Sequence, residues 1–196
     1  YGSGIYVTGY YNSSSLVFGT TTLTNAGPTG YNDLFIVKYD NAGTVQWAKS
    51  AGGTNIDFGN SIAADANGVY VAGNFYSATL VFGSTTLTNA GSTSSGDIFI
   101  VKYDVNGTPV WAKSAGGTGD DGGYAVAANG SAVYMAGKYL SSTVTFGSTS
   151  LTNAGQTDIF LVKYDNAGTV VWAKKAGGSS YENCSCLLYT SPSPRD

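Results

Sequence analysis

A repeat of about 64 residues runs through most of the sequence, and it restricts the possible folds more than any other feature. Three sets of equivalent residues mark it: Tyr6, Tyr70 and Tyr134; Phe18, Phe82 and Phe146; and Asn25, Asn89 and Asn153. Trp47 and Trp111 are also separated by 64 residues, whereas Trp111 and Trp172 are separated by 61. The missing residues fall between Gly155 and Asp158, which indicates a surface loop there.

Each copy of the repeat consists of short apolar segments separated by turn residues. The second copy predicts four main strands, at Ser61–Asp65, Val69–Phe75, Ile98–Asp104 and Pro109–Gly116, and a small extra hairpin within Leu80–Gly91. Strand-forming residues dominate these segments, and no segment has helical periodicity. The turns read DNAG, DVNG or DANG, in which Asp bonds the backbone two residues on and Gly takes a positive φ. Such short connections make neighbouring strands antiparallel.

The expected sheets carry apolar side chains on both faces. In the strand Ile98–Asp104, Phe99 and Val101 point to one face, and Ile98 and Ile100 point to the other. Similar sheets must therefore cover both faces, which radial repetition achieves. We expect an all-β fold, a partial β-propeller of about three four-stranded antiparallel blades with an extra small hairpin in each blade.

The blades are expected to occupy residues 1–180. Residues 1–51 form a partial blade without its innermost strand, and residues 59–116 and 123–177 form two full blades. Propellers usually contain four to eight blades, so an arc of three leaves two blade faces uncovered. We expect the isolated chain to be poorly soluble or to self-associate.

The C-terminal residues 186–196, CLLYTSPSPRD, do not continue the repeat. They resemble the conceptual translation of a transposase-type sequencing-library adapter, and we interpret them as a disordered artefact. Cys184 and Cys186 are therefore not interpreted as a metal-binding or redox pair. On this interpretation more repeats followed in the gene, and the remaining blades of the same chain are expected partners.

The composition argues against several classes of function. The formal net charge is −3, with 9 Lys and Arg against 12 Asp and Glu, which does not favour binding to a phosphate backbone. The chain has no histidine, and no apolar stretch approaches the ~20 residues of a membrane span. No phosphate loop, dinucleotide fingerprint, nucleophile elbow or HExxH motif occurs. We assign no catalytic residue, cofactor or metal ligand, and we expect neither a nucleic-acid partner nor a membrane span.

Lysine, aspartate and tryptophan recur in every copy, as Lys38, Lys102 and Lys163, as Asp40, Asp104 and Asp165, and as Trp47, Trp111 and Trp172. A catalytic site needs one copy, so we interpret the lysines and aspartates as structural: lysine stems cover apolar surface and aspartates open turns. The tryptophans are predicted to pack under the neighbouring blade, and the alternative is that they stack against sugars.

An acidic residue stands four positions after each double glycine, as Asp57, Asp121 and Glu182. Calcium loops need several oxygen ligands at close spacing, whereas only one acid recurs here. We therefore expect these side chains to bond main-chain amides in the turn between blades.

Tyrosines at positions that differ between copies are of more functional interest, since function on a repeat scaffold tends to lie where copies differ. They are Tyr10, Tyr11, Tyr31, Tyr76 and Tyr139. Several lie near the extra hairpin, on the propeller face that is often used for binding. These tyrosines indicate that face as a candidate for binding, and no site is assigned to them.

The motifs together resemble a known family. The pattern D-I-F-x-V-K-Y-D-x-x-G-x-x-x-W-A-K-x-A-G-G, then an acidic residue, then I-A/V-A-x-x-x-G-x-x-Y-V-A/T-G, is similar to the SBBP repeats of bacterial β-propellers, from Gly4 to about Gly178. The third copy departs from it at Asn129, where the second has Asp65. The resemblance implies that Ser61–Asp65 is innermost and that the strand containing Trp111 is outermost. The form with FGSTTLTNAG implies a secreted, multidomain bacterial protein.

These observations predict a non-enzymatic, extracellular or cell-surface repeat scaffold, which binds an unidentified protein or glycan or spaces other domains. One alternative is a propeller polysaccharide lyase or hydrolase whose active site lies in further blades. The other is a multivalent lectin.

Overall fold

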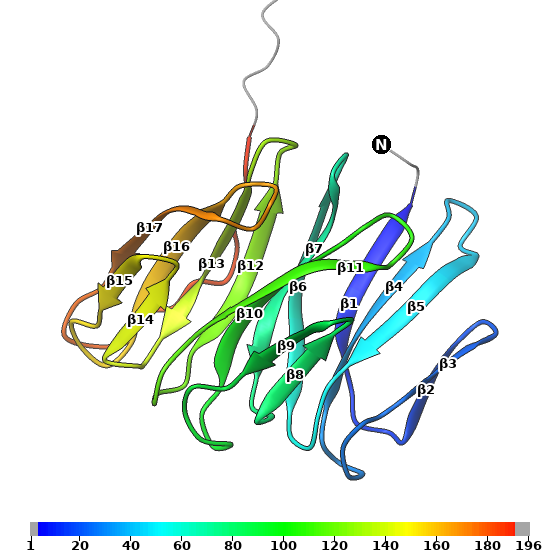
Figure 1. Ribbon diagram of the computed structural model, residues 1–196, viewed down its shortest axis with the longest axis horizontal. Coiled ribbons are helices and arrows are strands. Elements are labelled where there is room, and N and C mark those ends of the chain that lie inside the picture. Colours follow the sequence, from blue (N-terminus) through cyan, green and yellow to red (C-terminus); the bar gives the residue numbers. More distant parts are fainter. Residues whose placement is uncertain (1–3, 191–196) are drawn as a thin grey trace, which may run out of the picture.

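The computed structural model describes residues 4–190. All regular structure in this part of the chain is β, in strands β1–β17, and it contains no helix (Figure 1). Every strand pairing within its sheets is antiparallel. The predicted all-β class is confirmed, and the sheets are arranged as the blades of a partial propeller rather than as a closed barrel.

Three sheets of similar topology follow one another along the chain, and we call them blades 1, 2 and 3. Blade 1 contains β1 (Ile5–Tyr11), β4 (Asp33–Tyr39) and β5 (Val45–Ala51), in the order β1-β4-β5. Blade 2 contains β6 (Asp57–Asp65), β7 (Gly68–Phe75), β10 (Asp97–Tyr103) and β11 (Pro109–Ala115), in the order β11-β10-β7-β6. Blade 3 contains β12 (Gly122–Ala128), β13 (Val133–Tyr139), β16 (Asp158–Tyr164) and β17 (Val170–Ala176), in the order β12-β13-β16-β17.

Each blade also carries one two-stranded hairpin between its second and third strand positions. The hairpins are β2 (Ser15–Phe18) with β3 (Thr21–Thr24), β8 (Thr79–Phe82) with β9 (Thr85–Thr88), and β14 (Thr143–Phe146) with β15 (Thr149–Thr152). In blade 2, the Phe82 ring of the hairpin packs against Phe99 of β10, with 5.5 Å between ring centroids. β8 also contacts β5 of blade 1, and β14 contacts β11 of blade 2, so the hairpins help to fill the joints between blades.

The innermost strand is longer than the sequence predicts. β6 begins at Asp57 rather than at Ser61, although Asp, Gly and Asn in this stretch are poor strand formers. The register between β6 and β7 shifts between Gly59 and Ser61, and the same irregularity recurs in blade 3 between Gly123 and Ala125. Pairing with β7 therefore extends the strand past residues of weak propensity, and the β-bulge accommodates one extra residue.

Alternate residues of each third strand pack against different neighbours, as predicted. Phe99 and Val101 are buried in the core that blade 2 shares with blade 1, whereas Ile98 and Ile100 are buried in the core shared with blade 3. β6 contacts both β1 and β12, which places it at the inner end of the stack. Figure 1 shows the three blades side by side, with blade 2 between the other two.

Candidate functional site

The repeated lysine and tryptophan form a joint with the next blade. Trp47 Nε1 and Lys38 Nζ, both in blade 1, donate to the carbonyl oxygen of Val105 in blade 2, at 3.1 and 3.2 Å. The indole ring lies over Gly107, where a Cβ would be 2.9 Å from the ring. The predicted packing of this tryptophan under the neighbouring blade is confirmed.

The same joint connects blades 2 and 3. Trp111 Nε1 and Lys102 Nζ both donate to the carbonyl oxygen of Asn166, each at 3.1 Å, and the indole lies over Gly168. The Lys102 ammonium also lies 5.6 Å from the centroid of the Tyr70 ring. The cation thus lies between an aromatic face and a carbonyl dipole, both of which stabilise its charge. Neither side chain is left available for a reaction.

The repeated aspartates open turns, as predicted. Asp104 Oδ1 accepts hydrogen bonds from the amides of Asn106 and Thr108, at 2.9 and 2.8 Å. Gly107 ends the turn with φ +79°. These bonds hold the carbonyl of Val105 where the joint with blade 1 requires it.

The acid after each double glycine also bonds the backbone. Asp57 Oδ2 accepts from the Gly53 amide at 2.9 Å and from Ser77 Oγ at 2.7 Å, and Asp121 Oδ1 accepts from the Ser141 amide at 3.0 Å. In the third copy, Glu182 Oε2 accepts from the Gly178 amide at 3.0 Å. These side chains bond main-chain amides, as predicted. The donating amide lies in the double-glycine turn for Asp57 and Glu182, whereas Asp121 bonds the Ser141 amide in the loop after β13. Among residues 4–190, no group of three or more acidic or cysteine side chains is placed to hold a metal ion.

A second buried carboxylate lies beside the first glycine of each pair. Asp97 Oδ2 accepts from the Ala90 amide at 2.7 Å, while its Oδ1 packs against Gly116 and has no hydrogen-bond partner. Burial, with a smaller contribution from the charge of Asp121, raises the pKa of Asp97 to about 6. Burial, with a minor contribution from the charge of Asp33, likewise raises the pKa of Asp57 to about 6. These carboxyls are structural, since each lies behind the turn between blades.

The five tyrosines singled out in the sequence divide into two groups. Tyr11 and Tyr139 are buried in the core, so they do not belong to a surface site. Tyr10 and Tyr31 are exposed, and Tyr76 is half-buried. Tyr10 and Tyr76 are brought close to each other through Phe58, whereas Tyr31 is not part of this contact.

The resulting surface cluster, which we call the aromatic patch, consists of Tyr10, Phe58, Tyr76 and Tyr124. Tyr10 meets Phe58 edge to face, with centroids 4.8 Å apart and an angle of 84°, and Phe58 meets Tyr76 at 6.5 Å and 86°. Tyr124 is the extra residue in the bulge of β12. Bulges re-aim side chains and recur beside functional sites. The patch includes residues from all three blades, with Tyr10 in β1, Phe58 in β6 and Tyr124 in β12.

Polar groups lie within and beside the patch. Tyr76 Oη donates to Asp120 Oδ1 at 2.5 Å, and the Gly96 amide donates to the same oxygen at 3.0 Å. Burial, together with the neighbouring carboxylate of Asp120, raises the pKa of Tyr76 above its usual value. Lys138 Nζ lies 5.7 Å from the centroid of the Tyr124 ring. The patch therefore combines apolar rings with one carboxylate and one ammonium group.

Sequence reasoning missed Phe58, Asp120 and Tyr124, although one signal was present. All three differ from their equivalents in the other copies: Phe58 aligns with Gly122, Asp120 with Ile56, and Tyr124 with Asn60. A comparison of the copies position by position would have found them. Only the tertiary structure shows that all three lie near Tyr76, because Phe58 belongs to blade 2 and Tyr124 to blade 3.

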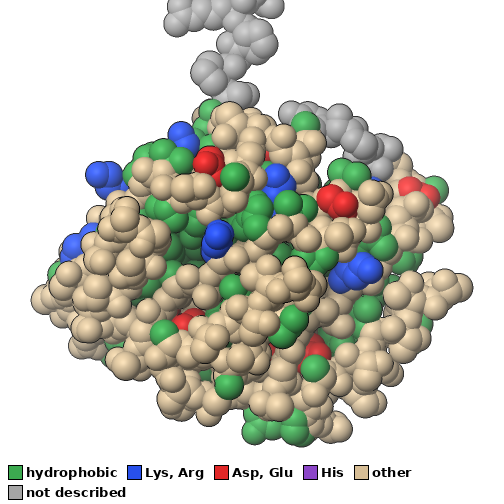
Figure 2. Space-filling view, viewed as in Figure 1, with side chains coloured by type: hydrophobic (Ala, Val, Ile, Leu, Met, Phe, Trp, Pro, Cys, Tyr) green, Lys and Arg blue, Asp and Glu red, His purple; other side chains and the backbone are tan. Residues whose placement is uncertain are grey.

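The face shown in Figure 2 carries few charged side chains, which are scattered singly rather than gathered into a patch. The only salt bridge between described residues joins Lys175 Nζ to Asp158 Oδ2 at 3.1 Å. No helix long and apolar enough to cross a membrane occurs in residues 4–190.

Two curated proteins are similar to this chain. Regulatory protein FlaEY of Caulobacter vibrioides is 30% identical over 180 residues, which cover 89% of this chain and 19% of that protein. An uncharacterized WD repeat-containing protein of Acanthamoeba polyphaga mimivirus is 26% identical over 221 residues, which cover 87% of this chain and 16% of that protein. The chain thus spans less than a fifth of the length of either relative. No family model matches the chain, so the SBBP resemblance is not confirmed.

Proposed function

We propose that the chain is part of a non-enzymatic binding scaffold, and that the aromatic patch is the place where a protein partner binds. The patch supports this proposal because it consists of residues that are not repeated from blade to blade. The repeated lysines, aspartates and tryptophans supply joints and turns, whereas Tyr10 and Phe58 supply exposed and half-exposed rings. Aromatic side chains are enriched in the energetic centres of protein interfaces.

The relatives and the composition support the same proposal. The two similar proteins are a regulatory protein and a WD repeat-containing protein, and both fit a scaffold that acts through partners. The low charged fraction of 11% and the abundant Gly fit an extracellular repeat protein of the SBBP type. We include the extracellular location and this family in the proposal.

The test is binding of the purified chain to an array that carries both peptides and bacterial glycans. We expect peptide ligands whose affinity falls about tenfold or more in the variant Tyr10→Ala, the magnitude typical of an interface hot spot. Tyr31→Ala is the matched control, because Tyr31 is also an exposed tyrosine but lies outside the patch. Peptide binding that is equally affected by both substitutions, or by neither, would contradict the proposal, as would binding to glycans alone.

A further inference from the structure

Each of the two joints between blades contains a pocket, and the two pockets are equivalent. The pocket between blades 1 and 2 has a volume of about 220 Å³, and the pocket between blades 2 and 3 has a volume of about 260 Å³. Both lie inside the stack of blades rather than at its ends. We call them the first and second joint pockets, and residues at the same repeat positions line both: Lys49, Phe82 and Tyr103 in the first, and Lys113, Phe146 and Tyr164 in the second.

Two neighbouring blades contribute to each joint pocket. In the first, Lys49 lies on β5 of blade 1, whereas Phe82 comes from the hairpin of blade 2 and Tyr103 from β10. Lys49 follows Trp47 by two residues, so alternation along the strand directs both side chains toward blade 2. The Trp47 indole closes the joint over the turn at Gly107, and the pocket is the space that remains beside the hairpin.

The tyrosine of each joint pocket is almost fully buried, and its hydroxyl has no hydrogen-bond partner within residues 4–190. Tyr103 is 2% exposed and Tyr164 is 3% exposed. Burial alone raises the pKa of both hydroxyls, so they stay protonated and can only gain a partner by donating or accepting a hydrogen bond in neutral form. A buried tyrosine hydroxyl usually finds such a partner, and a phenylalanine would pack here without needing one. An acceptor in the pocket would satisfy these hydroxyls.

The lysine of each joint pocket also lacks a partner in the described part of the chain. Lys49 and Lys113 are exposed, and the only salt bridge between described residues lies elsewhere, in blade 3. They differ in this from Lys38 and Lys102, whose ammonium groups donate to carbonyl oxygens of the next blade. Among the described residues, no acidic side chain lines either pocket. Each pocket therefore presents one positive charge without a negative one.

These groups indicate the chemistry of a ligand. One ammonium group and one hydroxyl donor suit a single carboxylate, which accepts strong charge-assisted hydrogen bonds. The apolar neighbours suit a short aliphatic stem, since each pocket has a phenylalanine ring, with Pro109 beside it in the first and Val170 in the second. A sugar ring would also need acceptors for its own hydroxyls, and no carboxylate or amide side chain in residues 4–190 lines either pocket. An acidic amino-acid side chain fits these conditions best.

We propose that each joint pocket binds a glutamate or aspartate side chain of a protein partner. Its carboxylate accepts from Lys49 Nζ and Tyr103 Oη in the first pocket, and from the equivalent lysine and tyrosine in the second. Two equal pockets let one partner present two acidic side chains at once, which raises the overall affinity above that of either pocket. The pockets involve the outer strands β5 and β11, whereas the aromatic patch lies on the inner strands, so this proposal does not rest on binding at the patch.

The first test is a titration of the chain with a capped glutamate, N-acetylglutamate N′-methylamide, followed by nuclear magnetic resonance. The amides of Gly83 and Gly147 report on the first and second pockets, because each of these glycines lines one of them. We expect saturable shifts at both glycines, with dissociation constants in the millimolar range that rise with salt concentration. Capped glutamine has the same shape without the charge, and it should cause no saturable shift.

Two substitutions use each pocket as the control for the other. Tyr103→Phe removes only the hydroxyl, and it should weaken binding at the first pocket about tenfold while the shifts of Gly147 stay unchanged. Lys113→Met removes the charge and keeps an apolar stem, so it should abolish saturation at Gly147 but not at Gly83. Circular dichroism of both variants should match that of the native chain, because neither change removes a hydrogen bond within the described residues.

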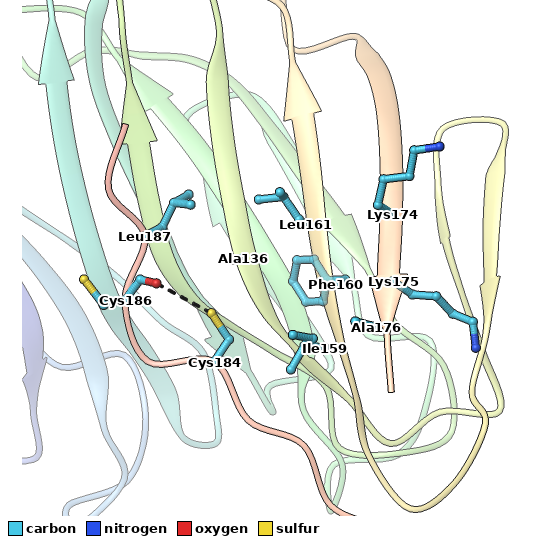
Figure 3. A pocket seen from close by; sticks show the side chains of 10 residues that line it. All are labelled: Ala136, Ile159, Phe160, Leu161, Lys174, Lys175, Ala176, Cys184, Cys186 and Leu187. Atoms are coloured by element: carbon cyan, nitrogen blue, oxygen red, sulfur yellow. Dashed lines mark hydrogen bonds between the residues drawn. The ribbon is translucent and has the colours of Figure 1, made fainter. Parts of the chain in front are cut away.

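Lys174 provides a matched control, since it occupies the same repeat position in blade 3. Figure 3 shows it beside a different cavity, with Cys184 and Leu187 of the C-terminal segment on the other side. This cavity has a volume of about 350 Å³, and no described tyrosine lines it. Lys174→Met should therefore leave the shifts of both reporter glycines unchanged.

Several results would overturn the proposal. They are shifts that do not saturate, equal responses to capped glutamate and capped glutamine, and an effect of Tyr103→Phe that is absent or common to both pockets. Loss of binding in Lys174→Met would equally show that the joint pockets are not the site. Glucuronate that binds more tightly than capped glutamate would replace the protein partner with an acidic polysaccharide.

Discussion

Trp111 of blade 2 donates its indole N–H to the main-chain carbonyl of Asn166 in blade 3, at 3.1 Å. The ring is 9% exposed, and it covers the turn that carries the acceptor. Trp111, for which stacking against sugars was the alternative role, is therefore part of the joint between blades 2 and 3. The contribution of this joint to the stability of the protein can therefore be measured by mutation.

Trp111→Ala is expected to lower the free energy of unfolding by about 3–5 kcal/mol, because it leaves a cavity between two blades and removes a buried hydrogen bond. Urea denaturation followed by tyrosine fluorescence measures the change. Val110→Ala is the control, since Val110 is the neighbouring residue on β11 and is 55% exposed; it should cost within about 0.5 kcal/mol. Equal losses for the two variants would show that the indole does not hold the joint.

Gly168→Ala is expected to destabilise the protein more than Gly130→Ala does. The two glycines have φ +80° and +82°, so the backbone strain of an alanine, about 1 kcal/mol, is common to both. Only at Gly168 would the new methyl group press on an indole, 2.8 Å from the ring of Trp111. The additional cost should be about 1–3 kcal/mol. Thermal unfolding of both variants measures the difference, and a smaller effect at Gly168 would count against the joint.

Gly116→Ala is expected to cost about 3 kcal/mol or more, because the methyl group would collide with the Asp97 carboxylate. The cost should fall when Asp97 is itself replaced by alanine, since the smaller side chain leaves room. A double-mutant cycle from denaturant unfolding measures this coupling, and we expect about 1–3 kcal/mol. Additive effects would mean that the glycine is required for another reason.

Stability is expected to rise as the pH falls from about 7.5 to 5. Burial raises the pKa of both Asp57 and Asp97 to about 6 in the folded chain, from 3.8. Between these values the folded state binds more protons than the unfolded state, so acidification stabilises it, and the stabilisation is lost as the pH rises through 6. Melting temperatures should be about 2–8 °C higher at pH 5.

The control for this pH dependence is Asp97→Asn, which removes one of the carboxyls with a raised pKa and should reduce the shift in melting temperature. Asp57, Asp33 and Asp121, whose pKa values burial also raises, retain the rest of the shift. Asp165, whose pKa is lowered by hydrogen bonds from the Thr169 and Ala167 amides, has the opposite effect, but only below about pH 4. A melting temperature that falls between pH 7.5 and 5 would contradict the buried-carboxyl interpretation.

The blade order and the two-sided packing of the third strand could be predicted from the sequence. Alternation in Ile98–Val101 assigns side chains to opposite faces without any knowledge of the neighbours, and turns such as Asp104–Gly107 fix antiparallel pairing between consecutive strands. The beginning of β6 at Asp57 could not be predicted, because pairing with β7 extends the strand through residues of low strand propensity.

The sequence by itself determined the repeat, the class of fold and the structural role of what is repeated. These follow from local alternation and turn chemistry, which depend on neighbours along the chain. The tertiary structure alone decided that Trp111 meets Asn166 and that Tyr10, Phe58 and Tyr76 form one patch. Such contacts depend on how blades stack, and their partners lie tens of residues apart, so no local pattern encodes them.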